Sequence, residues 1–442
     1  MRFFRLIFDF IAICGLSNVA LLYFNHIPLF FSLPITIFLC IANLVVNIIP
    51  GSYKTRSKRC RVLGGGIDLL IVFMYATIAD IVIAVNMLLF GGYEFWQYVV
   101  HGIIAFLVCG TAFWNGIIRC YTTSAQLGIK LRVLGAVFGM VPIVNIVFLV
   151  IIISTARKEV IYEMKHDAIE EGRKGQNICA TKYPVLLVHG VFFRDRKSFN
   201  YWGRIPSALT LNGATIFYGN QQSALSVKDS AMELSERIKE IIRETGAEKV
   251  NIIAHSKGGL DARYAISRLG CDKYTATLTT INTPHRGCIF VDNIFKQIND
   301  DARNTMASAY NTMAKTTGDT NPDFLSAVSD LRHSVCEEFN KNVPDCDGVI
   351  YRSVGSSASK TSQTRFPMSV FFPFVSRTEG ENDGLVSVEA MKWGESFKLI
   401  RVKGERGVSH ADVIDLNKDN IDGFDVREFY VSLVAELKKE GF

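Results

Sequence analysis

The sequence lacks several features that mark common functional classes. Its 10 cysteines include no C-x-x-C pair of the metal-binding type, and no internal repeat or low-complexity tract is present. The formal net charge of +6 is modest for 442 residues. It does not indicate nucleic-acid binding, which requires concentrated basic patches. Much of the positive charge instead lies in loops beside apolar segments, where it favours attraction to anionic lipid.

The cysteines outside the apolar segments form an odd set, namely Cys179, Cys271, Cys288, Cys336 and Cys346. An odd set without paired spacing is typical of free thiols, and free thiols persist in reducing compartments. The cysteine pattern therefore favours a cytoplasmic position for this part of the chain.

What the sequence does have is a strong division into two parts. Residues 1–155 consist largely of long apolar blocks, whereas residues 156–442 carry most of the charge. Blocks of about 20 residues are long enough to cross a bilayer core. They span 3–24, 28–49, 67–90 and 98–118, and a fifth at 133–154 is interrupted by Pro142 and Asn145. The sequence predicts a multi-pass transmembrane helical domain at 1–155 with four to five spans, a linker helix at 156–181 and a globular domain at 182–442.

Basic residues between the blocks predict orientation, because cytoplasmic loops carry an excess of Lys and Arg. The loop after the second block is rich in them, at Lys54, Arg56, Lys58, Arg59 and Arg61, whereas the turn at 91–97 has none. Arg157, Lys158 and Lys165 favour a cytoplasmic position for the domain at 182–442. That placement requires the fifth block to turn back at Pro142, since a full crossing would put the domain outside. The first block lacks a small-residue cleavage site, which predicts a retained helix.

From Tyr183 onward, short β-rich runs alternate with amphipathic helical segments. The runs are 185–188, 215–218, 250–254, 275–281, 349–354 and 397–402. Between the second and the third, apolar residues recur at helical spacing, at Ala231, Leu234, Ile238 and Ile241. This alternation is typical of a mostly parallel sheet covered by helices on both faces. We predict an α/β fold for 182–442, preceded by an all-α transmembrane domain.

The strongest chemical signal is the stretch Val250-Asn-Ile-Ile-Ala-His-Ser256-Lys-Gly-Gly259, where an apolar strand runs into a helix. A nucleophilic serine must project from a sharp, strained turn that admits only small residues on either side. Ala254 and Gly258 provide that room. We therefore predict that Ser256 is a nucleophile.

Such a serine also needs hydrogen-bond donors where negative charge develops on the substrate oxygen. One donor is expected to be the backbone N–H of Lys257, directly after the nucleophile. The second is expected from the loop that follows the first strand, as the backbone N–H of Val191 beside Gly190. Together, Val191 and Lys257 form the predicted oxyanion hole.

The predicted base is His410, because it is the histidine that follows every predicted strand. The chain order in this fold class is serine, acid, histidine. The acid should lie on a loop after a strand, and Asp383 fits, with Glu381 as the alternative. His189, at a strand end beside Gly190, is instead typical of a structural hydrogen-bonding residue.

Five motifs in sequence order resemble those of the bacterial triacylglycerol lipases, which are serine esterases of the α/β-hydrolase family. They are Val188-His-Gly190, Ala254-His-Ser-Lys-Gly-Gly-Leu-Asp-Ala-Arg263, Asn282-Thr-Pro-His-Arg-Gly287, Asn382-Asp-Gly-Leu-Val-Ser387 and Ser409-His-Ala-Asp412. The resemblance covers about 182–442. It implies hydrolysis of lipid esters by Ser256, Asp383 and His410, and a helical lid at about 290–342.

Two features depart from the lipase pattern. Some of these lipases hold a structural calcium ion through an Asp two residues after the catalytic histidine. Asp412 matches, but Leu416 stands where a further ligand is expected, so we assign no metal and no cofactor. The membrane domain has no counterpart in these lipases. It resembles the RDD type of membrane domain through the stretch 61–68, Asp80 and Leu127-Gly-Ile-Lys130, a resemblance that implies no activity.

The sequence thus predicts a membrane-bound lipase or esterase whose partners are a lipid or acyl-ester substrate and the bilayer, with no nucleic acid. Two alternatives remain open. One is a lipid acyltransferase that uses the same triad with an alcohol in place of water, and the other is an inactive membrane scaffold or transport protein. The intact set of Ser256, Asp383 and His410 argues against an inactive protein.

Overall fold

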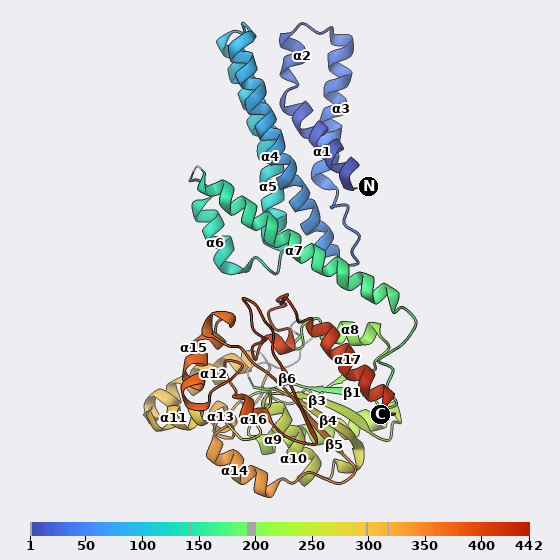
Figure 1. The fold of residues 1–442 in the computed structure, drawn as a ribbon, viewed down its shortest axis with the longest axis vertical. Helices are drawn as coiled ribbons and strands as arrows, with labels where there is room; N and C mark the ends of the chain where they lie inside the picture. The colour runs from blue at the N-terminus through green and yellow to red at the C-terminus, as the bar shows by residue number, and fades with distance from the viewer. Residues whose placement is uncertain (1, 142, 192–199, 298, 317) are drawn as a thin grey trace. The chain divides into compact units, whose positions relative to one another are not determined.

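The computed structural model describes residues 2–141, 143–191, 200–297, 299–316 and 318–442. The chain divides into two compact units, which we call the helical unit (Met1–Gly172) and the sheet unit (Arg173–Phe442). Figure 1 shows both units, and each is described by itself below.

The described residues of the helical unit form helices joined by short connections. The helices are α1 (Arg2–Ser17), α2 (Ala20–Phe24), α3 (Leu29–Ile48), α4 (Lys58–Phe90), α5 (Phe95–Thr123), α6 (Gly128–Phe138) and α7 (Val144–Gly172). Among the described residues, α3, α4 and α5 are long and apolar enough to cross a membrane.

The first and fifth apolar blocks do not each form one long apolar helix. The first is divided into α1 and α2 by a turn at Asn18 and Val19. The fifth covers the end of α6 and the start of α7, and α7 then continues to Gly172, within the stretch 156–181 that was expected to form the linker helix. The break expected at Pro142 lies outside the described residues. The number of membrane spans therefore stays a prediction.

Two carboxylates of α4 are buried among apolar side chains and have polar partners within the helical unit. Asp80 accepts hydrogen bonds from Ser17 Oγ at 2.8 Å and from Asn18 Nδ2 at 2.6 Å, at the turn between α1 and α2. Asp68 accepts a hydrogen bond from Arg2 Nη2 at 2.9 Å. Because buried charges without partners are costly, these contacts explain how α4 accommodates both acids.

The sheet unit contains six parallel strands in the order β2-β1-β3-β4-β5-β6. The strands are β1 (Val185–Val188), β2 (Ile216–Tyr218), β3 (Val250–His255), β4 (Thr275–Ile281), β5 (Ile350–Ser356) and β6 (Ser396–Ile400). The predicted α/β fold is confirmed, and the predicted strands agree with these bounds to within two residues.

Helices cover the sheet, and four further helices, α11 to α14, follow one another in the chain between β4 and β5. These helices are α8 (Ile205–Leu211), α9 (Val227–Thr245), α10 (Lys257–Arg268), α11 (Ile289–Gln297), α12 (Asp300–Thr316), α13 (Phe324–Ser329), α14 (His333–Asn342), α15 (Met368–Glu379), α16 (Val388–Met391) and α17 (Val426–Lys439). The helix predicted from the apolar spacing at 231–241 is α9, whose first turn is capped by Ser226 Oγ.

Alternate side chains of each strand enter cores on opposite faces of the sheet, as the pleat of a β-strand requires. In β1, Val185 and Leu187 pack with α8 and α17, whereas Leu186 and Val188 pack with α9 and α10. Because both faces of β1 are buried, this strand reads as a continuous apolar run. All six residues of β3 are buried, so this central strand is a fixed support for whatever follows it.

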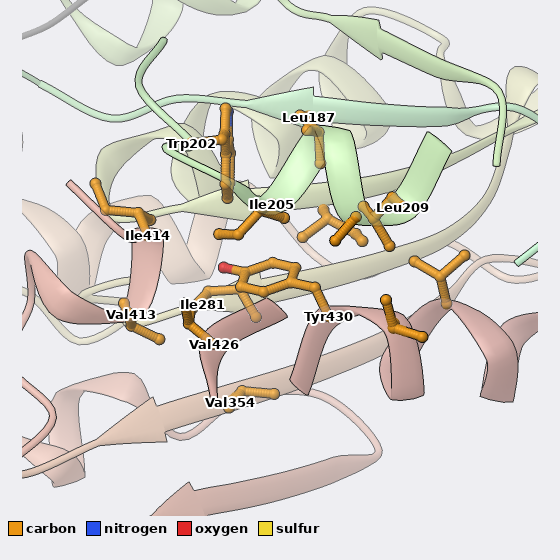
Figure 2. Close-up of a cluster of buried hydrophobic side chains, with 14 of the residues drawn as sticks. Leu187, Trp202, Ile205, Leu209, Ile281, Val354, Val413, Ile414, Val426 and Tyr430 are labelled. Atoms are coloured by element: carbon orange, nitrogen blue, oxygen red, sulfur yellow. The ribbon is translucent and has the colours of Figure 1, made fainter. Parts of the chain in front are cut away.

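One of these cores is centred on Trp202 and Tyr430, whose rings lie edge to face with centroids 6.0 Å apart. Figure 2 shows Leu187, Ile205 and Leu209 pointing into the same cluster. This core attaches α8 and α17 to the sheet, and it therefore also supports the chain segment immediately before α17.

Replacing Leu187 with Ala should lower the free energy of unfolding of the sheet unit by about 2–5 kcal/mol, because a fully buried side chain leaves a cavity. Denaturant unfolding of the detergent-solubilised full-length protein, followed by tryptophan fluorescence, measures this change. Leu211→Ala is the matched control, since Leu211 is 58 % exposed. Equal unfolding midpoints for the two variants would show that the cluster does not support the unit.

Candidate active site

The backbone turns sharply at Ser256, between the end of β3 and the start of α10. Ser256 has φ 55° and ψ −133°, a conformation that residues with a side chain rarely adopt. Such strain costs about 1–3 kcal/mol and persists only where neighbouring groups enforce it. Ser256 N–H donates to the Ile281 carbonyl at 3.0 Å, and Thr283 Oγ1 donates to the Ser256 carbonyl at 2.8 Å. The turn is therefore held by the strand next to β3.

Two glycines make this turn possible by allowing close approach. A Cβ atom on Gly258 would lie 2.3 Å from the His189 carbonyl oxygen, and one on Gly190 would lie 2.8 Å from Ser256 Cβ. Any larger residue at these positions would push α10 or the loop after β1 away from the serine. A small residue is thus required at position 258 because α10 packs closely against the loop after β1.

His410 and Asp383 lie in direct contact beside this turn. His410 Nδ1 is 2.7 Å from Asp383 Oδ2, and His410 N–H donates to the Asp383 carbonyl at 3.0 Å. Because the ionised carboxylate only accepts hydrogen bonds, it fixes the tautomer with the proton on Nδ1 and leaves Nε2 as the basic atom. The ring of His410 lies 4.5 Å, centroid to centroid, from that of His255, the residue immediately before Ser256.

The Asp383 carboxylate is completely buried and surrounded by donors. Its Oδ1 atom accepts from the backbone N–H groups of Leu385 and Val386, both at 2.8 Å. Its Oδ2 atom accepts from Asn282 Nδ2 at 2.7 Å as well as from His410. Hydrogen bonds to the charged form stabilise a buried carboxylate, so Asp383 orients the imidazole from a fixed position.

Glu381, the alternative acid, has different partners. Its carboxylate receives two hydrogen bonds from Arg401, at 2.6 and 2.5 Å, and one from Ser357 Oγ at 2.6 Å. The hydrogen bonds of Arg401 hold the pKa of Glu381 below its usual value. The geometry around His410 therefore favours Asp383 as the acid.

His255 is buried beside His410, and its role differs from that of a base. Burial, and then the charge on His410, hold the pKa of His255 well below its usual value. Its Nδ1 atom lies 2.7 Å from Tyr201 Oη, and this hydroxyl oxygen accepts a hydrogen bond from Gly190 N–H at 3.1 Å. Tyr201 thus joins the loop after β1 to the turn at the serine.

The two predicted oxyanion donors belong to segments next to this turn: Lys257 follows Ser256 directly, and Val191 follows Gly190, where an added Cβ atom would lie 2.8 Å from Ser256 Cβ. Lys257 is the first residue of α10, and the first N–H groups of a helix have no partner within the helix. Its ammonium group is buried and donates to Asp261 Oδ1 at 2.7 Å and Ser230 Oγ at 2.9 Å. Burial raises the pKa of Asp261 to about 7. Val191 is also buried, and it is the last residue described before position 200 in its loop.

The loop that carries Val191 is held at His189. His189 Nε2 lies 2.8 Å from the Gln221 carbonyl, and Gln221 Nε2 donates to the His189 carbonyl at 2.9 Å. These contacts describe a structural histidine at the end of β1. Because β1 and β3 are adjacent parallel strands, their carboxyl ends bring the Val191 loop and Ser256 to the same edge of the sheet.

The chain is similar in sequence to several known proteins. A model of the palmitoyl protein thioesterase family matches residues 184–324. A triacylglycerol lipase of Pseudarthrobacter phenanthrenivorans is 32% identical over 178 residues, which cover 38% of this chain and 55% of that protein. A triacylglycerol lipase of Pseudomonas fragi is 26% identical over 300 residues, which cover 59% of this chain and 98% of that protein.

The sheet unit, hereafter the hydrolase unit, has the α/β-hydrolase architecture and is similar in sequence to lipases and to the palmitoyl protein thioesterase family. The predicted resemblance of the C-terminal part is thereby confirmed. The chain spans about half the length of the Pseudarthrobacter protein and of a Burkholderia plantarii lipase, which is also 32% identical. Among solved structures, the Staphylococcus hyicus lipase matches with a TM-score of 0.44 and 17% identity, over 59% of this chain and 97% of that chain.

Two residues that support the site in the hydrolase unit were not assigned a role from the sequence. Asn282, which follows β4 and has φ 48°, donates from Nδ2 both to Asp383 Oδ2 and to Ser356 Oγ, each at 2.7 Å. The available signal was its position, because a polar residue directly after a central parallel strand lies at the edge where ligands bind. Ser356, at the end of β5, carried no comparable motif.

Asn282→Ala should slow the reaction of the hydrolase unit with a fluorophosphonate, a reagent that labels activated serines. The loss of one hydrogen bond to a buried charge costs about 1.5–3 kcal/mol, which corresponds to about a ten- to hundredfold slower labelling rate. Asn342→Ala, at an exposed position of α14, is the control. A labelling rate within about twofold of the wild type would mean that Asn282 does not position Asp383.

Proposed function

We propose that the protein is a serine lipase or esterase that hydrolyses carboxylic esters of lipids, with Ser256 as nucleophile, His410 as base and Asp383 as the orienting acid. The observation that carries the proposal is the contact between His410 Nδ1 and Asp383 Oδ2 beside the strained turn at Ser256. The relatives named triacylglycerol lipase support a lipid ester as the substrate class.

Acylation begins when His410 Nε2 accepts the proton of Ser256 Oγ and this oxygen attacks the ester carbonyl carbon. The carbonyl π electrons move to the oxygen, and the backbone N–H groups of Val191 and Lys257 stabilise the resulting oxyanion. The tetrahedral intermediate collapses, the C–O bond to the alcohol breaks, and His410 returns its proton to the departing alcohol oxygen.

Deacylation repeats these steps with water. His410 removes a proton from water, the hydroxide oxygen attacks the acyl carbon, and the bond to Ser256 Oγ breaks as the serine regains its proton from His410. The carboxylic acid is released. His255 stays neutral throughout, because burial and the positive charge of His410 both disfavour its protonation.

We further infer that the chain is an integral membrane protein with a catalytic unit on the cytoplasmic side. The support is the composition and length of α3, α4 and α5 and the basic residues before α4 and within α7. A polytopic anchor would keep the enzyme at the surface that contains its lipid substrates.

Fluorophosphonate labelling of the membrane-extracted full-length protein tests the triad. The wild type should be labelled, whereas Ser256→Ala should abolish labelling and ester hydrolysis without unfolding the unit. His410→Ala should also abolish labelling, and Asp383→Asn should lower kcat by about 10⁴-fold because the imidazole loses its tautomer and orientation. Retained turnover in Ser256→Ala would place the nucleophile elsewhere, and a mild effect of Asp383→Asn would exclude it as the orienting acid.

We also propose that the segment at about 290–342 acts as a lid. It contains α11 to α14 between the site loop after β4 and the start of β5. Met306 and Met313 of α12 are exposed by 55% and 43%. Apolar side chains on an otherwise polar surface helix are suited to contact with a lipid surface. The following loop is anchored by Asp319, which accepts hydrogen bonds from the backbone and side chain of Ser223.

Replacing Met306 and Met313 together with Ser should reduce the preference for emulsified over dissolved esters, because the two methionines would no longer favour the lipid surface. Hydrolysis of one ester below and above its solubility limit measures this preference. Met232→Ser on α9, at a residue that is 45% exposed, is the matched control. An unchanged preference in the double variant would remove the lid assignment.

A further inference from the structure

Three buried aspartates follow His410 along the chain, and three arginines lie against them. The aspartates are Asp412, Asp415 and Asp419, and the arginines are Arg204, Arg365 and Arg406. The formal charges of these six side chains cancel. Buried carboxylates require such partners, since an unpaired charge removed from water is costly.

Arg406 is the arginine that joins two of the carboxylates. Its Nη2 atom lies 3.0 Å from Asp412 Oδ1, 3.2 Å from Asp412 Oδ2 and 3.1 Å from Asp419 Oδ2. The side chains of Asp412 and Asp419 are 2% and 3% exposed, whereas that of Arg406 is 22% exposed. The guanidinium group therefore bridges two buried carboxylates that belong to different turns of the chain.

Asp412, which Arg406 contacts, also binds Ser409, the residue next to His410. Its Oδ2 atom accepts hydrogen bonds from Ser409 N–H at 3.0 Å and from Ser409 Oγ at 2.6 Å. Ser409 immediately precedes His410 in the chain. Asp412 thus closes the turn that carries His410, and Arg406 Nη2 contacts both oxygens of this carboxylate.

The other two arginines each form an ion pair with one of the aspartates. Arg204 binds Asp415, with Nε 2.8 Å from Oδ2 and Nη2 2.7 Å from Oδ1. Arg365 Nη1 lies 2.8 Å from Asp419 Oδ1. Arg365 therefore supplies the same charge as Arg406 to the same aspartate, whereas the ion pair to Asp412 comes from Arg406, so Arg365 is a suitable control.

A structural calcium ion, which the resemblance to lipases allows at Asp412, does not fit these residues. Calcium takes 6–8 oxygen ligands at about 2.3–2.6 Å. Here the carboxylate oxygens of Asp412 are already bound by Arg406 and Ser409, and the charge of the cluster is already balanced. Leu416 offers no side-chain ligand.

We propose that Arg406 is a positioning residue for the reaction, which holds the turn of His410 by bridging Asp412 and Asp419. This inference rests on the proposed function of His410 as the base. The guanidinium group supplies the positive charge that a metal ion would otherwise bring to this turn, and the turn therefore needs no divalent cation.

The test compares Arg406→Ala, Arg406→Lys and Arg365→Ala in the full-length, detergent-solubilised protein. Arg406→Ala should lower kcat and the fluorophosphonate labelling rate by about tenfold or more while KM stays within about twofold, because orientation of the base and not substrate binding is changed. Lys should restore part of the rate. Arg365→Ala should stay within about twofold of the wild type, although it also removes one positive charge.

A double-mutant cycle then asks whether Arg406 acts through Asp412. Asp412→Asn keeps an oxygen that accepts from Ser409 N–H but removes the charge that Arg406 binds. In the Asp412→Asn background, Arg406→Ala should have a smaller effect than in the wild type, because contacting residues are energetically coupled. Equal effects of Arg406→Ala in both backgrounds would overturn the proposal, as would equal losses in Arg406→Ala and Arg365→Ala.

Two further measurements separate this inference from the proposed function. Hydrogen exchange of the peptides at 404–416 should be faster in Arg406→Ala than in the wild type, a result that does not depend on catalysis. If the wild type is not labelled by fluorophosphonate, the proposed function fails even where this exchange difference is found. Incubation with EDTA should leave wild-type turnover unchanged, and a loss that calcium reverses would show that a metal ion, not Arg406, holds the turn.

Discussion

The hydrolase unit depends on one backbone constraint, the positive φ of Ser256 between β3 and α10. A conformation that is unfavourable by about 1–3 kcal/mol survives because its surroundings leave no alternative. β3 is buried along its whole length, α10 packs so closely that only glycine fits at 258, and the Ile281 carbonyl accepts the Ser256 N–H. The two cores that fix the sheet and its helices thus also fix the direction of the serine side chain.

The histidine side of the site is held by electrostatics and not by backbone strain. Asp383 is completely buried, and its carboxylate is saturated by two backbone N–H groups, Asn282 and His410. Donors that are fixed before substrate arrives need no reorganisation when the imidazole becomes charged. Arg406 provides a similar electrostatic contact next to His410. Its positive charge neutralises the Asp412 carboxylate, which closes the turn that carries His410.

The two halves of the site are joined by few polar contacts. Tyr201 connects Gly190 to His255, and Asn282 connects the end of β4 to Asp383. Tyr201 and Asn282 each use one side chain to hold two chain segments together at the carboxyl edge of the sheet. Parallel strands bring their loops together at this edge, which explains why residues far apart in the chain form one compact arrangement.

Much of the hydrolase unit was predictable from the sequence, because the relevant signals are local. Strands buried on both faces read as apolar runs, and Ser256 and His410 lie in short motifs whose order is characteristic of the fold class. The boundaries of the strands and the choice of Asp383 over Glu381 followed from such patterns, and the structure adds the partners that distinguish the two acids.

By itself, the sequence determined the fold class, the apolar helices and the candidate triad, since periodicity and short motifs are properties of neighbouring residues. Only the tertiary structure decided the roles of Asn282, Tyr201 and Arg406, because each acts through a contact that folding creates. Asn282 meets Asp383 across 101 positions, and Tyr201 meets His255 across 54. Likewise, a hydropathy profile reflects only the amino-acid composition of each segment. It does not reveal the turn at Asn18, where the side chains of Ser17 and Asn18 donate hydrogen bonds to Asp80 of α4.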